Sequence, residues 1–374
     1  MIYVVCFALS CFFVYLGQRS EKYTVMRSIF FFVAILFPSI LAGARDIGIG
    51  TDTIGYAYPA FKDAATAPTF KGMEARWDNW LEPGYLYMNF IFSKYTDISI
   101  FFGSLMFIQT LFTLAGLYVW RQKIDLWLGM LCYYCFVFSY SLNTMRQSFS
   151  LSVCFFAFSY FYIYRKKTIY FILCVILAMT FHKPAIIFLA IFMIYKYTEK
   201  YKSSISNMIL ILFILSFVII LCIGSFMFGD ILNAISLMHY TEYIQKTDIE
   251  PKFPYRSLIL LTPIAVLFYF NRKKIRDYST KYNFFICLLG GIFSVTLLPW
   301  SGNPDMKRIG ECFMWFICII LPIAVASYNL PKVKHFILNS SVAFYCIFYW
   351  FCIFIFRGYT EIYPYSSKIL ESIF

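Results

Sequence analysis

The chain has 374 residues, of which 61% are hydrophobic and only 14% are charged, and its mean hydropathy is +0.71. So few charges cannot cover a water-soluble surface, which excludes a set of soluble domains, a disordered chain and a coiled coil. The composition predicts an all-α polytopic integral membrane protein, formed as a single transmembrane domain over residues 1–374. The net charge of +13 is attributed to membrane topology and anionic lipids, with no nucleic-acid partner expected.

Apolar segments approaching the length that crosses ~30 Å of hydrocarbon predict about 12 (11–13) transmembrane helices, some of them short or re-entrant. They are expected at 2–17, 27–43, 98–120, 126–141, 148–164, 168–181, 184–197, 205–228, 257–270, 283–299, 309–329 and 336–356. Six short connectors after alternate segments hold 18 of the 32 Lys and Arg residues. The positive-inside rule puts these connectors in the cytoplasm, so both termini and two larger loops, 44–97 and 229–256, are expected outside.

One irregular point lies at His182, between the apolar segments 168–181 and 184–197. A single long helix through it would move the strongly basic stretch 271–281 to the outer side, so we interpret the region as two short segments. Fourteen helical residues reach only about 21 Å. We therefore expect the turn at His182 to dip below the outer membrane surface, where irregular backbone must be buried in protein or line a wet cavity.

The polar residues most able to carry chemistry gather on the predicted outer side. In chain order they are Arg45, Thr51, Asp52, Tyr56, Glu82, Asn143, Arg146, Gln147, His182 and Arg308. Most of the loop charges that determine the topology are other residues, so this convergence is an independent signal. It predicts a polar cavity open to the outer face.

Several of these residues have two interpretations. The GIGTDTIG segment lacks the spacing of a nucleotide-binding loop, and its glycines either let backbone amides approach an anion or form an ordinary turn. Arg146 either binds phosphate through its forked guanidinium or pairs with a structural carboxylate. His182 is a base or donor, or a helix-end residue. Arg308 either contacts an anion or belongs to a charge set with Glu311.

Four segments, taken in order, resemble the EpsG-like branch of the Wzy-type bacterial polysaccharide polymerases. They are RDIGIGTDTIGY at 45–56, EPGY at 82–85, LNTMRQSFSLSV at 142–153 and LAMTFHKPAIIF at 177–188, with a basic residue near Arg308 before a late span. The resemblance covers the first half of the chain through these motifs and the second half mainly through topology and hydropathy.

The resemblance implies a multi-pass glycosyltransferase of the bacterial cytoplasmic membrane, with its active site facing the periplasm or the outside. Its substrate would be an undecaprenyl-pyrophosphate-linked oligosaccharide, transferred onto another lipid-linked repeat unit of an O-antigen, capsule or exopolysaccharide. No nucleotide sugar, cofactor or metal is expected. A flippase and a chain-length regulator of the same pathway are expected partners beside membrane lipids. A lipid-linked oligosaccharide flippase and an O-antigen ligase are the alternatives.

Within that chemistry, we expect Arg146, Arg45 and Arg308 to contact the pyrophosphate. Asp52, Glu82 and His182 are the candidate bases for the acceptor hydroxyl, and the sequence leaves their order open. The side chains of Thr51, Tyr56, Asn143 and Gln147 are expected to bind or orient the substrate.

Overall fold

The computed structural model describes residues 2–77, 80–201, 203, 208, 210–212, 214–215, 253–297 and 310–372. These residues form helices and connecting loops, with no strand among them. The helical fold class is thereby confirmed. The predicted segment 205–228, the loop 229–256 and Arg308 lie wholly or mostly outside the described residues.

The first part of the chain contains the following elements. They are α1 (Ile2–Arg19), α2 (Thr24–Ala44), the π-helix η1 (Thr53–Ala57), α3 (Tyr58–Thr66), α4 (Phe70–Trp77), α5 (Pro83–Tyr95), α6 (Ile98–Tyr118), α7 (Leu126–Tyr133), the π-helix η2 (Tyr134–Phe138), α8 (Ser139–Ser141), α9 (Met145–Ala157) and the π-helix η3 (Phe158–Tyr164).

The remaining elements follow in chain order. They are α10 (Thr168–Met179), the 3-10 helix η4 (Lys183–Ile186), α11 (Ile187–Lys200), α15 (Tyr255–Phe270), α16 (Arg272–Tyr278), α17 (Tyr282–Val295), α19 (Ile317–Ala326), α20 (Lys332–Trp350), the π-helix η6 (Phe351–Phe356), the 3-10 helix η7 (Tyr359–Glu361) and α21 (Lys368–Glu371).

Four helical stretches of the described chain are long and apolar enough to cross a membrane. They are Ile2–Arg19, Thr24–Ala44, Ile98–Tyr118 and Lys332–Phe356. Shorter apolar helices are found at Leu126–Ser141, Thr168–Met179, Tyr255–Phe270, Tyr282–Val295 and Gly310–Ala326, each at a predicted segment. The chain thus has the apolar helices of a membrane protein, whereas the count of about twelve spans and the sidedness of the termini stay predictions.

The chain divides into two compact units. The first comprises Met1–Phe188, Ile317–Pro322 and Leu330–Phe374, and the second comprises Leu189–Phe316 and Ile323–Asn329. Every described residue of the predicted site belongs to the first unit. The single transmembrane domain stays a prediction.

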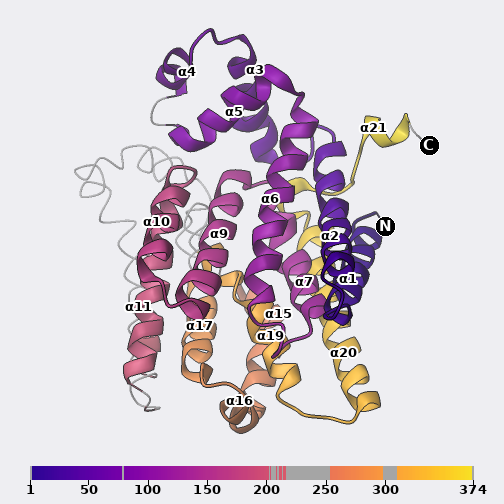
Figure 1. The fold of residues 1–374 in the computed structure, drawn as a ribbon, viewed down its shortest axis with the longest axis vertical. Helices are drawn as coiled ribbons and strands as arrows, with labels where there is room; N and C mark the ends of the chain where they lie inside the picture. Colours follow the sequence, from indigo (N-terminus) through magenta and orange to yellow (C-terminus); the bar gives the residue numbers. More distant parts are fainter. Residues whose placement is uncertain are drawn as a thin grey trace. The chain divides into compact units, whose positions relative to one another are not determined.

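In the first unit, neighbouring helices pack in a row in which α1 contacts α2, α2 contacts α6, α6 contacts α9 and α9 contacts α10 (Figure 1). Several polar side chains inside this row form hydrogen bonds between helices, as burial favours. The Nε2 of Gln109 on α6, for example, donates to the hydroxyls of Tyr133 at 2.8 Å and Ser141 at 2.6 Å. This hydrogen bonding joins α6 to the 126–141 helical stretch.

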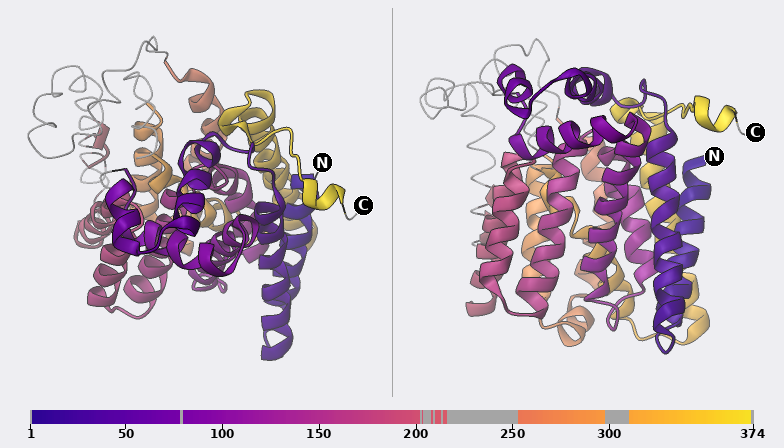
Figure 2. Two further views of the ribbon diagram at one scale, coloured as in Figure 1. Left: turned by 90° about the horizontal axis from the view of Figure 1, so that it is seen from above. Right: turned by 45° about the horizontal axis from the view of Figure 1, so that its top comes forward.

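The segment 44–97 folds into short helices that lie across one end of this row (Figure 2). Small residues on α3, Ala60 and Ala64, are fully buried. Phe61 of α3 contacts Phe101 of α6, with ring centroids 5.3 Å apart. The segment thus packs apolar side chains against the end of α6.

In the second unit, the short helix α16 carries the basic run predicted at 271–281. The Nζ of Lys281, just after α16, lies 3.0 Å from Glu199 Oε1 on α11 and donates to the hydroxyl of Tyr195. The basic stretch 271–281 is therefore held to α11 by an ion pair and a hydrogen bond. The apolar residues on either side of it form α15 and α17.

Candidate functional site

Arg45 follows directly after the end of α2, and its side chain folds back into the protein. Its guanidinium donates to the carbonyl of Leu142 and lies 3.4 Å from the Thr53 hydroxyl and 4.7 Å from the centre of the Phe102 ring. The residue is only 5% exposed. Burial lowers the pKa of Arg45 to about 10, still well above neutral pH, so the side chain stays charged.

The glycine turn after Arg45 packs against the 142–143 turn. Gly50 has a φ of +86°, and a Cβ there would lie 3.2 Å from the Leu142 carbonyl oxygen and 3.3 Å from Asn143 Oδ1. Glycine is required because other residues rarely adopt that φ and would crowd both atoms. Asn143 Oδ1 also accepts from the Asp52 amide at 2.8 Å and the Thr51 hydroxyl at 3.1 Å. We call Asn143 with the residues held around it, namely Arg45, Gly50, Thr51 and Asp52, the Asn143 turn.

Glu82 precedes α5 and connects three separate segments. Its Oε2 forms an ion pair with Arg146 on the first turn of α9. Its Oε1 lies 3.2 Å from His182 Nδ1 and accepts from the Lys183 amide at 3.2 Å. The side chains of Glu82, Arg146 and His182 are 9%, 12% and 6% exposed. We call these three residues, with the tyrosines described next, the Glu82 cluster.

Two tyrosines complete the Glu82 cluster. The guanidinium of Arg146 lies 4.4 Å from the centre of the Tyr56 ring and 5.9 Å from that of Tyr85. The two rings meet edge to face, with centroids 6.0 Å apart. Arg146 therefore has a carboxylate on one side and aromatic faces on others, an arrangement that keeps a cation in place at low exposure.

A close backbone contact brings the EPGY motif to the His182 turn. The amide of Gly84 donates to the Thr180 carbonyl at 2.8 Å. A Cβ on Gly84 would lie 2.5 Å from Thr180 Oγ1 and 2.8 Å from that carbonyl oxygen. Only glycine allows this approach, so the motif supplies both the carboxylate and the space that lets the carboxylate reach its partners.

Charge and hydrogen bonding determine the protonation state of Glu82. Burial acts to raise the pKa of this carboxyl, but the hydrogen bond from His182 and the positive charge of Arg146 outweigh it and lower the pKa to about 2. Glu82 is therefore a carboxylate at any physiological pH. Its lone pairs are directed at three donors.

The structure brings most of the predicted site together. Nine of the ten predicted residues are described, and eight of them belong to the Glu82 cluster or the Asn143 turn, which meet along the 142–146 stretch. Gln147 follows Arg146 on α9 and is buried. Arg308 lies outside the described residues. No group of three His, Cys, Asp or Glu side chains placed to hold a metal occurs among the residues described.

Sequence reasoning missed two contributors, and it did not predict that Tyr85 of the EPGY motif would lie against Arg146. Thr180 had no signal beyond its position before the FH pair. The C-terminal segment was also missed: the Lys368 amide donates to Asp46 Oδ1 at 3.0 Å, and the Ser367 hydroxyl donates to the Ala44 carbonyl at 2.5 Å. This contact covers the base of the glycine turn.

Comparison with protein families supplies an identification. The chain belongs to the EpsG family, whose sequence model matches residues 28–367. That range includes all four motif segments. The predicted family is confirmed. No curated protein and no solved structure matches the chain.

Proposed function

We propose that the chain, as a member of the EpsG family, is a polysaccharide polymerase that joins lipid-pyrophosphate-linked glycans at the outer face of the bacterial cytoplasmic membrane. One observation carries the proposal: four motifs far apart in sequence meet around Glu82, Arg146 and His182. A buried cation beside a histidine and a carboxylate suits a reaction that has an anionic leaving group and a hydroxyl acceptor.

The reaction is the transfer of a glycan between two lipid carriers. The bond from the anomeric carbon of the donor sugar to the pyrophosphate oxygen breaks, and a bond from that carbon to the acceptor hydroxyl oxygen forms. The lipid pyrophosphate leaves with the bonding electrons, and the hydroxyl proton passes to a base. We assign the pyrophosphate to Arg146, because a guanidinium contacts phosphate oxygens in a bidentate manner and stays charged.

The geometry favours His182 over Glu82 as the base. Glu82 is a weak base, because its pKa is about 2 and three donors surround it. Its contact with His182 Nδ1 instead fixes the ring, so the acceptor proton would go to Nε2. A carboxylate that orients a histidine base also stabilises the imidazolium that forms. Asp52 is the second candidate base.

The Asn143 turn contributes to the same chemistry by holding the backbone next to the Glu82 cluster. Arg45 holds the Leu142 carbonyl, and Asn143 holds the Thr51–Asp52 segment. Arg45 in this way positions Arg146, four residues after Leu142. The proposal thus assigns Arg45 to the pyrophosphate site indirectly, through the backbone that it holds. It gives direct pyrophosphate contact to Arg308 beside Arg146, and sugar contacts to Thr51, Tyr56, Asn143 and Gln147.

A purified-component assay tests the function. The full chain in liposomes is given lipid-linked repeat units extracted from a polymerase-deficient strain, with no nucleotide sugar. A ladder of products on a gel is expected. Bilayer crossing without elongation would show a flippase, and elongation only onto a lipid A core would show a ligase.

The His182 assignment has its own test. His182→Gln should lower the rate of ladder formation on the order of a hundredfold or more. Asp52→Asn is the comparison variant and should change it less. The reverse order of effects would transfer the role of base to Asp52.

A further inference from the structure

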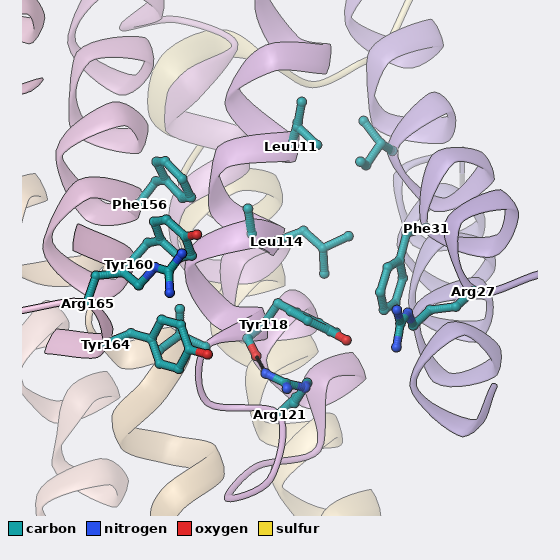
Figure 3. A pocket seen from close by; sticks show the side chains of 13 residues that line it. Arg27, Phe31, Leu111, Leu114, Tyr118, Arg121, Phe156, Tyr160, Tyr164 and Arg165 are labelled. Atoms are coloured by element: carbon teal, nitrogen blue, oxygen red, sulfur yellow. Dashed lines mark hydrogen bonds between the residues drawn. The ribbon is translucent and has the colours of Figure 1, made fainter. Parts of the chain in front are cut away.

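A second polar site lies at the other end of the same helices. The helical stretch formed by α9 and η3 carries Arg146 near its start, and Arg165 follows its end, so roughly 25–30 Å of helix separates them. That distance is close to the thickness of a hydrocarbon core. Near Arg165, a cavity of about 460 Å³ opens between α2, α6 and η3 (Figure 3).

Three arginines line this cavity: Arg27 on the first turn of α2, Arg121 in the loop after α6, and Arg165 directly after η3. Each lies over a tyrosine ring: Arg27 and Arg121 are 5.7 Å and 4.4 Å from the centre of Tyr118, and Arg165 is 5.7 Å from that of Tyr160. Within the described residues, no carboxylate comes within 4.0 Å of any of the three guanidinium groups. The cavity therefore carries three positive charges without a carboxylate of the described residues at ion-pair distance.

The connector that carries Arg121 is held in place. Gln18 Nε2 at the end of α1 donates to the carbonyls of Arg121 and Ile124 at 3.0 Å each, and Gln18 Oε1 accepts from the Leu126 amide at 2.8 Å. The guanidinium of Arg121 also donates to the Tyr118 carbonyl at 3.2 Å. Hydrogen bonds to α1 and to the end of α6 thus fix the position of Arg121 in the lining of the cavity.

The rest of the cavity is apolar. Its lining includes Ile35, Leu111, Leu114, Ala115 and Phe156, and Figure 3 shows Leu111 at the end away from Arg121. Leu111 is 41% exposed, so the apolar end is open at the side of the helices. A ligand that fits has an anionic group at one end and a hydrocarbon chain at the other.

We propose that this cavity binds one phospholipid with an anionic headgroup. The phosphate lies among Arg27, Arg121 and Arg165, and the start of one acyl chain runs along Leu111 and Leu114 toward the open side. A headgroup with its own ammonium would be repelled by three cations that lack a carboxylate partner, so net negative charge is the selected property. All three arginines are among the basic residues whose positions predict the cytoplasmic side, where anionic lipids are available.

Lipid binding to the purified full chain tests this proposal. Native mass spectrometry in detergent would compare phosphatidylglycerol with phosphatidylcholine. The chain should prefer phosphatidylglycerol, and the triple variant Arg27→Gln, Arg121→Gln, Arg165→Gln should bind it on the order of a hundredfold more weakly, since each cation near an anionic headgroup contributes similarly. The matched control is Lys22→Gln, Lys166→Gln, Lys167→Gln, which removes three exposed charges from neighbouring connectors.

The control triple should keep the preference for phosphatidylglycerol. Equal loss in both triples would overturn the proposal, because net charge alone would then explain binding. Full competition by the same concentration of inorganic phosphate would also overturn it, as would preferential binding of a polyprenyl phosphate. Ala115→Phe fills the apolar part without changing charge and should weaken binding too, which keeps the proposal testable if the arginine triple fails to fold.

Discussion

Two arginines at the same end of the helices, Arg146 and Arg45, have opposite surroundings. Arg146 faces a carboxylate and two aromatic rings. Arg45 faces a carbonyl, a hydroxyl, a thioether sulfur and a ring, all of them uncharged. A guanidinium whose terminal nitrogens donate to neutral backbone and side-chain acceptors fixes a turn. A guanidinium that is held by one carboxylate and by ring faces, as Arg146 is, can also contact a second anion.

The largest effect is expected at Arg146. Arg146→Ala should lower polymer formation by about a hundredfold to a thousandfold, the usual cost of removing one donor to a developing negative charge. The measurement is ladder formation per folded protein in liposomes. Arg76→Ala is the matched control, because Arg76 also forms an ion pair, with Asp63 at 2.8 Å, but its side chain is 47% exposed.

Arg76→Ala should leave the rate unchanged. An Arg146→Ala protein that elongates glycans within a few-fold of the wild-type rate would remove Arg146 from the reaction. Arg146 and Arg45 would then differ only in how they contribute to stability.

Glu82→Gln should have the next largest effect, on stability. The Glu82 pKa falls from the usual 4.5 to about 2 in the folded protein, which corresponds to a stabilisation of about 3 kcal/mol above pH 4.5. Because the folded pKa is the lower one, this stabilisation is lost as the pH falls from about 4.5 toward 2. The wild type should therefore have a higher Tm than Glu82→Gln above pH 4.5, and this difference in Tm should shrink as the pH falls from about 4.5 toward 2.

The partly exposed Asp63–Arg76 pair gives the reference for that measurement. Asp63→Asn should change stability by no more than about 1 kcal/mol, because solvent screens the pair. A gap for Glu82→Gln that stayed constant down to pH 2 would contradict the ionised carboxylate.

Arg45→Gln tests whether Arg45 fixes a turn, whereas Arg146 acts in the reaction. Loss of the bond to the Leu142 carbonyl should destabilise the protein by about 2 kcal/mol, since buried hydrogen bonds from charged donors contribute ~1.5–3 kcal/mol. Ladder formation per folded protein should fall less than tenfold. The measurement is Tm together with KM for the lipid-linked donor. An unchanged Tm with a raised KM would place Arg45 on the pyrophosphate.

The fold was more predictable than the site contacts, for a physical reason. Apolar runs specify helices locally, so the helices at 2–19, 98–118 and 332–356 fall close to their predicted positions. The convergence of the polar residues also followed from loop charges. The partners of Glu82 did not, because they depend on backbone approaches such as Gly84 on Thr180, where the sequence shows a glycine but not what lies against it.

The smallest effect should come from the glycine turn over Arg45. Gly50→Ala places a Cβ at a φ of +86°, 3.2 Å from the Leu142 carbonyl oxygen, and should cost about 1–2 kcal/mol. Gly48→Ala is the control, because a Cβ at Gly48 meets nothing within 4 Å. Thermal unfolding of the two variants in the same detergent should therefore differ, with only Gly50→Ala lowering Tm. Equal Tm values would mean that the turn does not need to press on the 142–143 backbone, and that the Asn143 turn is held by Arg45 alone.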